Sequence, residues 1–116
     1  MLSTRHRIPT PLIATIMRYG RRIADERLQL VISPNQTDAK RFSFIVSTKI
    51  DKRATHRNRI RRVLSESVRL RMDSIKPGVD CICIAKKGLA DLKQTEVDDI
   101  VIRLLIRAEL LVAGIK

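Results

Sequence analysis

The chain has 116 residues, 44% of them hydrophobic and 31% charged, which suits a single domain with a modest core. Its 24 lysines and arginines outnumber the 12 acids and give a formal net charge of +12, which a small domain rarely carries without a polyanion such as nucleic acid. A membrane would be the second candidate, but no apolar run approaches the roughly 20 residues that cross a bilayer.

The first half of the chain predicts a helix followed by two strands. Residues 1–9 form a basic, extended lead without the apolar core of a signal peptide, so we expect a cytoplasmic protein. A helix begins at Thr10 with proline next to it and ends at Gly20. Apolar and polar residues alternate over 28–33 and 42–48, which predicts two strands, most simply a hairpin.

The second half predicts a helix, a buried strand and a last helix. Thr55 is a good first cap for a helix that ends near Ile75, because the Pro-Gly pair that follows cannot continue it. Residues 79–85 are almost continuously apolar, as in a central strand, and residues 95–112 have helical apolar spacing. A further short strand fits at 46–49.

These elements predict an α+β fold for one domain spanning residues 1–116. We expect a small sheet with the helices packed on one face, and a split βαβ-like unit running from residue 42 to residue 85.

The helix that begins at Thr55 has one apolar face and one cationic face. Ile60, Leu64 and Val68 recur at helical spacing and predict the buried side. The opposite stripe, related by steps of three, four or seven, contains Asn58, Arg61, Arg62, Ser65 and Arg69, with Arg59 on its shoulder.

Few acids balance this cationic stripe, since Glu66 is the sole acid between Arg53 and Arg69. A guanidinium group matches two phosphate oxygens at once, and the amide of Asn58 offers a donor and an acceptor to a phosphate, sugar or base. The alternative is a solvated basic face without a specific partner.

Protein-centred catalysis and metal binding are not expected. The acids are scattered and suit helix caps or surface positions, and no carboxylate lies close to His56 in the sequence to orient it as a base. The two histidines and two cysteines cannot assemble a zinc site. Cys81 and Cys83 fall on one face of a strand, where two buried thiols are expected instead of a strained disulfide.

Several segments carry a recognisable pattern: Phe-Ile-Val-Ser-Thr-Lys at 44–49, Arg-Ala at 53–54, Arg-Asn-Arg-Ile-Arg-Arg at 57–62 and the cationic end of the strand at 80–87. This pattern resembles the strand end, linker, basic helix and later strand of the bacterial ribonuclease P protein subunit family. The likeness runs over most of the chain.

The resemblance implies a cytoplasmic protein that binds a catalytic RNA and the 5′ leader of precursor tRNA. It implies that the RNA, with Mg²⁺ bound mainly by the RNA, performs the hydrolysis, and that no protein partner is required. The RNA-binding residues expected from it are Lys49, Arg53, Arg57, Asn58, Arg59, Arg61, Arg62 and Arg69. The expected leader-binding cleft contains Ile13, Met17, Gln29, Val31, Ser33, Ser43, Ser47, Asn58, Arg61 and Ser65.

The chain departs from the family pattern where leader bases would stack. The aromatic residues usual in the family on the first helix and the facing strand are here Ile13, Met17 and Val31, so we expect weaker leader contacts. Thr48 and Asp51 also make the approach to the basic helix less cationic than is typical. A basic ribosomal protein remains the alternative function, and a DNA-binding protein is a weaker one.

Overall fold

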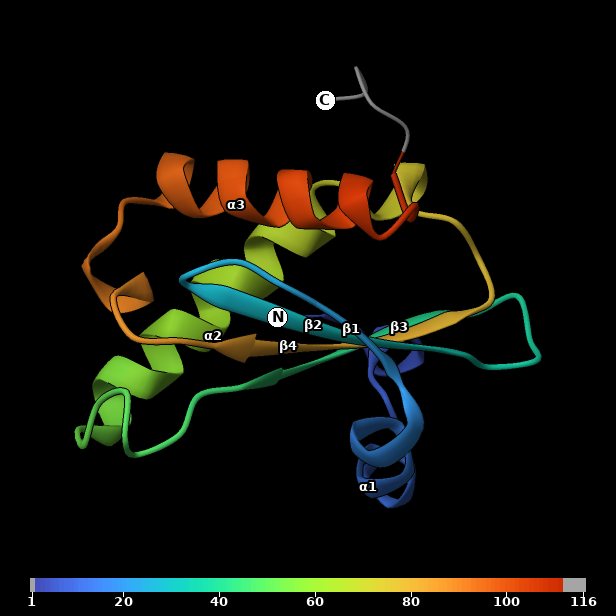
Figure 1. Cartoon of the computed structure of the whole chain (residues 1–116), viewed down its shortest axis with the longest axis horizontal. Coiled ribbons are helices and arrows are strands. Elements are labelled where there is room, and N and C mark those ends of the chain that lie inside the picture. Colours follow the sequence, from blue (N-terminus) through green and yellow to red (C-terminus); the bar gives the residue numbers. More distant parts are fainter. Residues whose placement is uncertain (1, 112–116) are drawn as a thin grey trace.

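The computed structural model describes residues 2–111 as a four-stranded sheet with helices on both faces (Figure 1). In chain order the helices and strands are α1 (Thr10–Tyr19), β1 (Arg21–Ala24), β2 (Leu28–Pro34), β3 (Lys40–Ile45), α2 (Ala54–Arg69), β4 (Val79–Ala85) and α3 (Gln94–Arg107). Single 3₁₀ turns lie at Thr4–His6, Met72–Ser74 and Leu89–Asp91. The α+β class and the predicted succession of helices and strands are confirmed.

The strands lie in the order β1-β2-β4-β3, so the predicted hairpin is wrong. β4 lies between β2 and β3 and pairs antiparallel with β2 and parallel with β3. Its apolar side chains point to both faces and need cover on both, which the centre of the sheet provides. Because β3 and β4 are direct neighbours, the βαβ unit is not split by another strand.

The sheet also gains a strand that the sequence did not predict. β1 pairs antiparallel with β2 along the edge of the sheet, and Arg21 and Arg22 in it are exposed. Two arginines mask the alternation by which a strand is recognised. The further strand proposed for 46–49 is absent from the described residues, where the backbone N–H of Ile50 instead donates to the carbonyl of Ser47 in a turn.

Two apolar cores cover the two faces of the sheet. α2 and α3 enclose the main core, which includes Leu30, Phe42 and Leu64. α1 lies on the opposite face, as Figure 1 shows, and packs Ile16 onto Val31 and Ile82. The prediction that the helices pack on one face is therefore right for α2 and α3 and wrong for α1. The opposite face of β2 and β4 is also apolar, and α1 covers it.

The lead before α1 is folded against the sheet. Leu2 and Ile8 are buried, and the backbone N–H of Ile8 donates to the carbonyl of Phe42 at 3.1 Å. A 3₁₀ turn interrupts the extended course that was predicted for 1–9. The apolar residues at either end of the lead thus anchor it beside β3.

Helix ends differ slightly from the predictions. α2 begins at Ala54, one residue before Thr55, and Arg53 is its N-cap. It ends at Arg69, and the predicted extension toward Ile75 is a separate 3₁₀ turn. α3 ends at Arg107, and Val112 lies outside the described residues.

Gly20 ends α1 at a point where the helix approaches β2 closely. A Cβ atom at this position would lie 2.6 Å from the carbonyl oxygen of Ile16 and 2.6 Å from Cγ1 of Val31. Since the carbonyl belongs to the backbone, the helix would have to shift. We expect Gly20→Ala to lower the free energy of unfolding by about 1–3 kcal/mol, as measured by urea denaturation. An unchanged unfolding midpoint would show that α1 is not held this closely.

Candidate nucleic-acid interface

Burial of one side of α2 turns its arginines outward. Ile60, Leu64 and Val68 are buried in the main core, as their spacing predicted. The cationic residues then occupy the remaining surface of the helix, with Arg62 exposed between two flanks. The two flanks face different neighbours.

The flank toward β3 is formed by Asn58, Arg61 and Ser65. Nη1 of Arg61 donates to Oδ1 of Asn58 at 2.6 Å, so the two polar groups act as one unit. Ser65 is buried, contrary to its predicted outward position, and its hydroxyl donates to the carbonyl of Arg62 at 3.0 Å. Beside this flank lies a recess of about 170 Å³ lined by Leu2, Arg7, Ile8, Phe42, Ser43, Phe44, Arg61 and Ser65.

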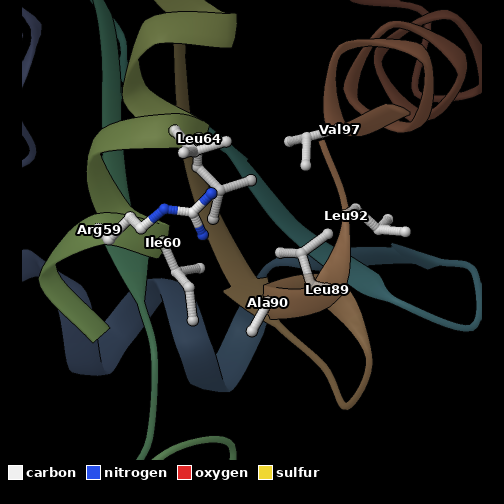
Figure 2. Close-up of a pocket in the computed structure, with 8 residues that line it drawn as sticks. Arg59, Ile60, Leu64, Leu89, Ala90, Leu92 and Val97 are labelled. Carbon is white, nitrogen blue, oxygen red and sulfur yellow. The ribbon is translucent and has the colours of Figure 1, made fainter. Parts of the chain in front are cut away.

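The flank toward α3 carries Arg59. Figure 2 shows its side chain extending alongside Ile60 and Leu64 toward Leu89, over a small apolar hollow. Arg59 is exposed although its side chain borders apolar residues, as the long aliphatic part of arginine allows. Arg59 is therefore separated from Arg61 by the width of the helix, and together they flank Arg62.

Internal carboxylates neutralise the two ends of α2 but not its middle. Arg53 pairs with Asp51 at 3.2 Å, and Arg69 pairs with Glu66 one turn back. Nη1 of Arg57 donates to the carbonyls of Asp51 and Lys52, which holds the loop before the helix. Among residues 2–111, Arg59, Arg61 and Arg62 form no ion pair. Their charges are available to a ligand.

Asp51 organises the approach to α2. Its carboxylate accepts hydrogen bonds from the backbone N–H of Arg53 at 2.9 Å and from the guanidinium of the same residue. Nδ1 of His56 lies 3.1 Å from the carboxylate, so the expectation that no acid orients this histidine is wrong. The two residues are five apart, and the turn of chain between them brings them together.

The hydrogen bonds from Arg53 lower the pKa of Asp51 from 3.8 to about 2, with a smaller effect from His56. Because the folded-state pKa is depressed, the carboxylate contributes stability that is present above pH 3.8 and is lost as the pH falls toward 2. We expect an NMR titration to find the Asp51 carboxyl near pKa 2, and Arg53→Ala to return the pKa toward its ordinary value. An ordinary pKa in the unmodified protein would contradict this arrangement.

The residues predicted to line one leader-binding cleft are divided among several places. Val31 is fully buried beneath α1, and Ile13 and Met17 pack beside it, so Val31 cannot line a groove. Ser33 borders a depression between α1 and the loop after β2, whereas Ser47 is exposed in the turn after β3. Gln29 is half-buried on the α1 face.

Ser43, Arg61 and Ser65 do come together in the recess at the edge of β3, with Asn58 bonded to Arg61. The sequence interpretation missed the other walls of this recess, contributed by Arg7, Ile8 and the two phenylalanines of β3. The apolar Leu2 and Ile8 within a basic lead were the signal that this segment packs onto the domain.

Lys49, Arg53 and Arg62 are exposed, but the guanidinium of Arg53 is already bound to Asp51. Across residues 2–111, no group of three or more histidine, cysteine, aspartate or glutamate side chains could hold a metal ion. In the same part of the chain no helix has the length and hydrophobicity that crossing a membrane requires.

A match to a family model shows which family the chain belongs to. The model described as Ribonuclease P matches residues 4–109, from the folded lead to the end of α3. The chain belongs to the ribonuclease P protein family. Its role is therefore that of a ribonuclease P subunit, and the ribosomal and DNA-binding alternatives are set aside.

Curated relatives and solved structures agree with this family. The ribonuclease P protein component of Pelotomaculum thermopropionicum is 35% identical over 95 residues, covering 82% of this chain and 84% of that protein. The corresponding protein of Clostridioides difficile is 33% identical over 96 residues, covering 82% and 83%.

The fold is similar to that of the ribonuclease P protein of Staphylococcus aureus, with a TM-score of 0.83, 23% identity and coverage of 91% of this chain and 97% of that one. The ribonuclease P protein of Thermotoga maritima gives a TM-score of 0.79 at 24% identity, covering 87% and 96%. At these identities the two structures support the fold of this chain and nothing beyond it.

Proposed function

We propose that this chain binds the catalytic RNA of ribonuclease P through α2 and helps that RNA to remove the 5′ leader of precursor tRNA. The observation that carries the proposal is the trio Arg59, Arg61 and Arg62, whose charges have no carboxylate partner among the described residues. In this proposal, phosphates of RNA supply the missing negative charge, because each guanidinium offers a fork of donors that matches phosphate oxygens.

The recess between β3 and α2 suits a nucleotide of single-stranded RNA. Its lining includes the half-buried ring of Phe44 and the guanidinium of Arg61, so the flat face of a base and a phosphate can be held side by side. In our proposal Asn58 fixes the direction of Arg61 and can offer its own amide N–H groups to a sugar or base. We propose the 5′ leader of precursor tRNA as the segment that lies along this side of the domain.

The hydrolysis itself is proposed to belong to the RNA. The described residues do not fit a protein site for Mg²⁺, because they contain no group of carboxylate, histidine or cysteine side chains that converges on one point. Mg²⁺ would therefore be held mainly by the RNA, and the protein would contribute charge neutralisation and positioning. A cytoplasmic location follows from such partners, and no protein partner is needed for this role.

Replacing both Asn58 and Arg61 with alanine tests the proposal. We expect the variant to bind the catalytic RNA at least about tenfold more weakly, since a phosphate contact and its positioning amide are lost. Precursor tRNA cleavage by the reconstituted enzyme at low Mg²⁺ should fall with it. The matched control is Arg103→Ala, which removes one exposed cation from α3. Equal behaviour of the two variants would contradict RNA binding on this flank of α2.

A further inference from the structure

The C-terminal end of α1 presents an exposed aromatic ring. Tyr19 is the last residue of α1, and 74% of it is exposed. The chain contains one tyrosine, two phenylalanines and no tryptophan. Phe42 is buried and Phe44 packs against the main core. Tyr19 is therefore the aromatic residue that this domain offers most fully to a partner.

Cations surround this ring. The guanidinium carbon of Arg18 lies 5.3 Å from the centre of the ring, which covers one side of it. Arg21 and Lys76 are exposed beside it, and Nη2 of Arg21 donates to the carbonyl of Ala108 at 2.8 Å, which fixes that side chain in place. Within residues 2–111, none of these three cations forms an ion pair.

The ring borders an open depression of about 400 Å³. Arg21 and Lys76 stand at its border, and its apolar lining includes Ile32, Pro77 and Leu110. An aromatic ring beside an apolar hollow, with cations at hand and no acid in the lining, is the combination that single-stranded nucleic acid uses: bases stack on the ring and phosphates meet the cations.

This surface is distinct from the α2 flank. Arg21 lies on the β1 edge of the sheet, whereas the recess beside Arg61 lies on the β3 edge. Three strand spacings separate the edges, roughly 14 Å. The depression also borders the beginning of β4 at Val79, while the chain enters α2 from the opposite end of β3.

We propose that Tyr19, together with Arg18, Arg21 and Lys76, forms a second contact for single-stranded RNA. One unstacked base lies on the free face of the tyrosine ring, and the neighbouring phosphates pair with the cations. The proposal rests on the proposed function, because it needs the same RNA partners, and it extends the RNA-binding surface to the β1 edge. The strand could come from the 5′ leader or from an unpaired segment of the catalytic RNA.

Tyr19→Ala and Tyr19→Phe test this contact in two arms. One arm measures the affinity of the protein for the catalytic RNA, and the other measures the affinity of the reconstituted enzyme for precursor tRNA with and without its leader. We expect Tyr19→Ala to weaken one of the two by about tenfold and Tyr19→Phe to stay within about twofold of the unmodified protein, because phenylalanine keeps the stacking ring. The affected arm identifies the source of the strand.

Because the chain has one tyrosine, incorporation of fluorotyrosine gives a single fluorine NMR resonance from this position. That resonance should shift when a short single-stranded RNA is added, and an acidic peptide of equal charge should leave it in place.

Unchanged affinities in both arms would overturn the contact, as would equal losses for the alanine and phenylalanine variants or a resonance that responds only to the peptide. If Asn58→Ala with Arg61→Ala still weakens RNA binding while Tyr19→Ala does not, this contact fails and the proposed function stands.

Discussion

Asp80→Ala is expected to lower the free energy of unfolding by about 3 kcal/mol. The Asp80 carboxylate is buried on the α1 face of β4, where Oδ1 accepts from Nε of Arg41 at 2.7 Å and Oδ2 from Nη2 at 2.9 Å. The Nδ2 group of Asn35 also donates to Oδ1. The hydrogen bond to Asp80 raises the pKa of Arg41, against the opposing effect of burial. Alanine would leave the Arg41 charge largely buried without its partner.

A double variant separates the loss of the ion pair from the cost of leaving the Arg41 charge without a partner. Arg41→Met combined with Asp80→Ala removes the unpaired charge, so we expect it to be more stable than Asp80→Ala alone by about 1–2 kcal/mol. Urea denaturation of the single and double variants measures both quantities. If Asp80→Ala unfolds at the same urea concentration as the unmodified protein, the pair does not join β3 to β4 as the structure indicates.

Changing Arg59, Arg61 and Arg62 together to alanine should produce the largest effect on RNA binding. Each phosphate contact contributes a log–log salt slope of about 0.7–0.9, so the slope should become shallower by about 2–3 and affinity at 0.1 M salt should fall by about 100-fold. Fluorescence anisotropy with the catalytic RNA across a salt series measures both quantities. Urea denaturation checks that the fold is kept, because Arg59 borders the apolar hollow beside Leu64.

A second triple variant controls for net charge. Arg22, Arg103 and Arg107 are exposed and lie on β1 and α3, and replacing all three with alanine removes the same amount of charge. We expect this variant to keep most of the affinity and most of the salt slope. Equal losses in the two triple variants would mean that total charge, and not its place on α2, determines binding.

The sequence predicted the elements of the fold more fully than their arrangement. The spacing of Ile60, Leu64 and Val68 identified the buried side of α2, because helical periodicity is a local property. The place of β4 between β2 and β3 depends on pairing between distant segments, which alternation within one strand does not encode. The edge strand β1 was hidden by its two arginines.

The sequence also predicted only part of the candidate site, because local patterns do not show which distant segments pack together. The motif located the cations of α2, and the fold leaves Arg59, Arg61 and Arg62 unpaired within the described chain, as their surplus over acids suggested. The burial of Ser65 and Val31 depends on which element covers each of them, β3 with the lead in one case and α1 in the other. Tyr19 lies outside the motif, and its exposure emerged from the packing of α1.

Directed cleavage of the catalytic RNA from a probe on α2 tests whether α2 binds that RNA. Cys81 and Cys83 are buried, and the hydrogen bond between their side chains, together with burial, raises the pKa of the Cys81 thiol, so neither should react with a thiol reagent in the folded protein. An iron chelate can then be attached selectively to Arg62→Cys or, as the comparison, to Arg103→Cys. We predict cleavage of the catalytic RNA at a few discrete positions from residue 62 and little from residue 103. Discrete cleavage from residue 103 with none from residue 62 would contradict binding through α2.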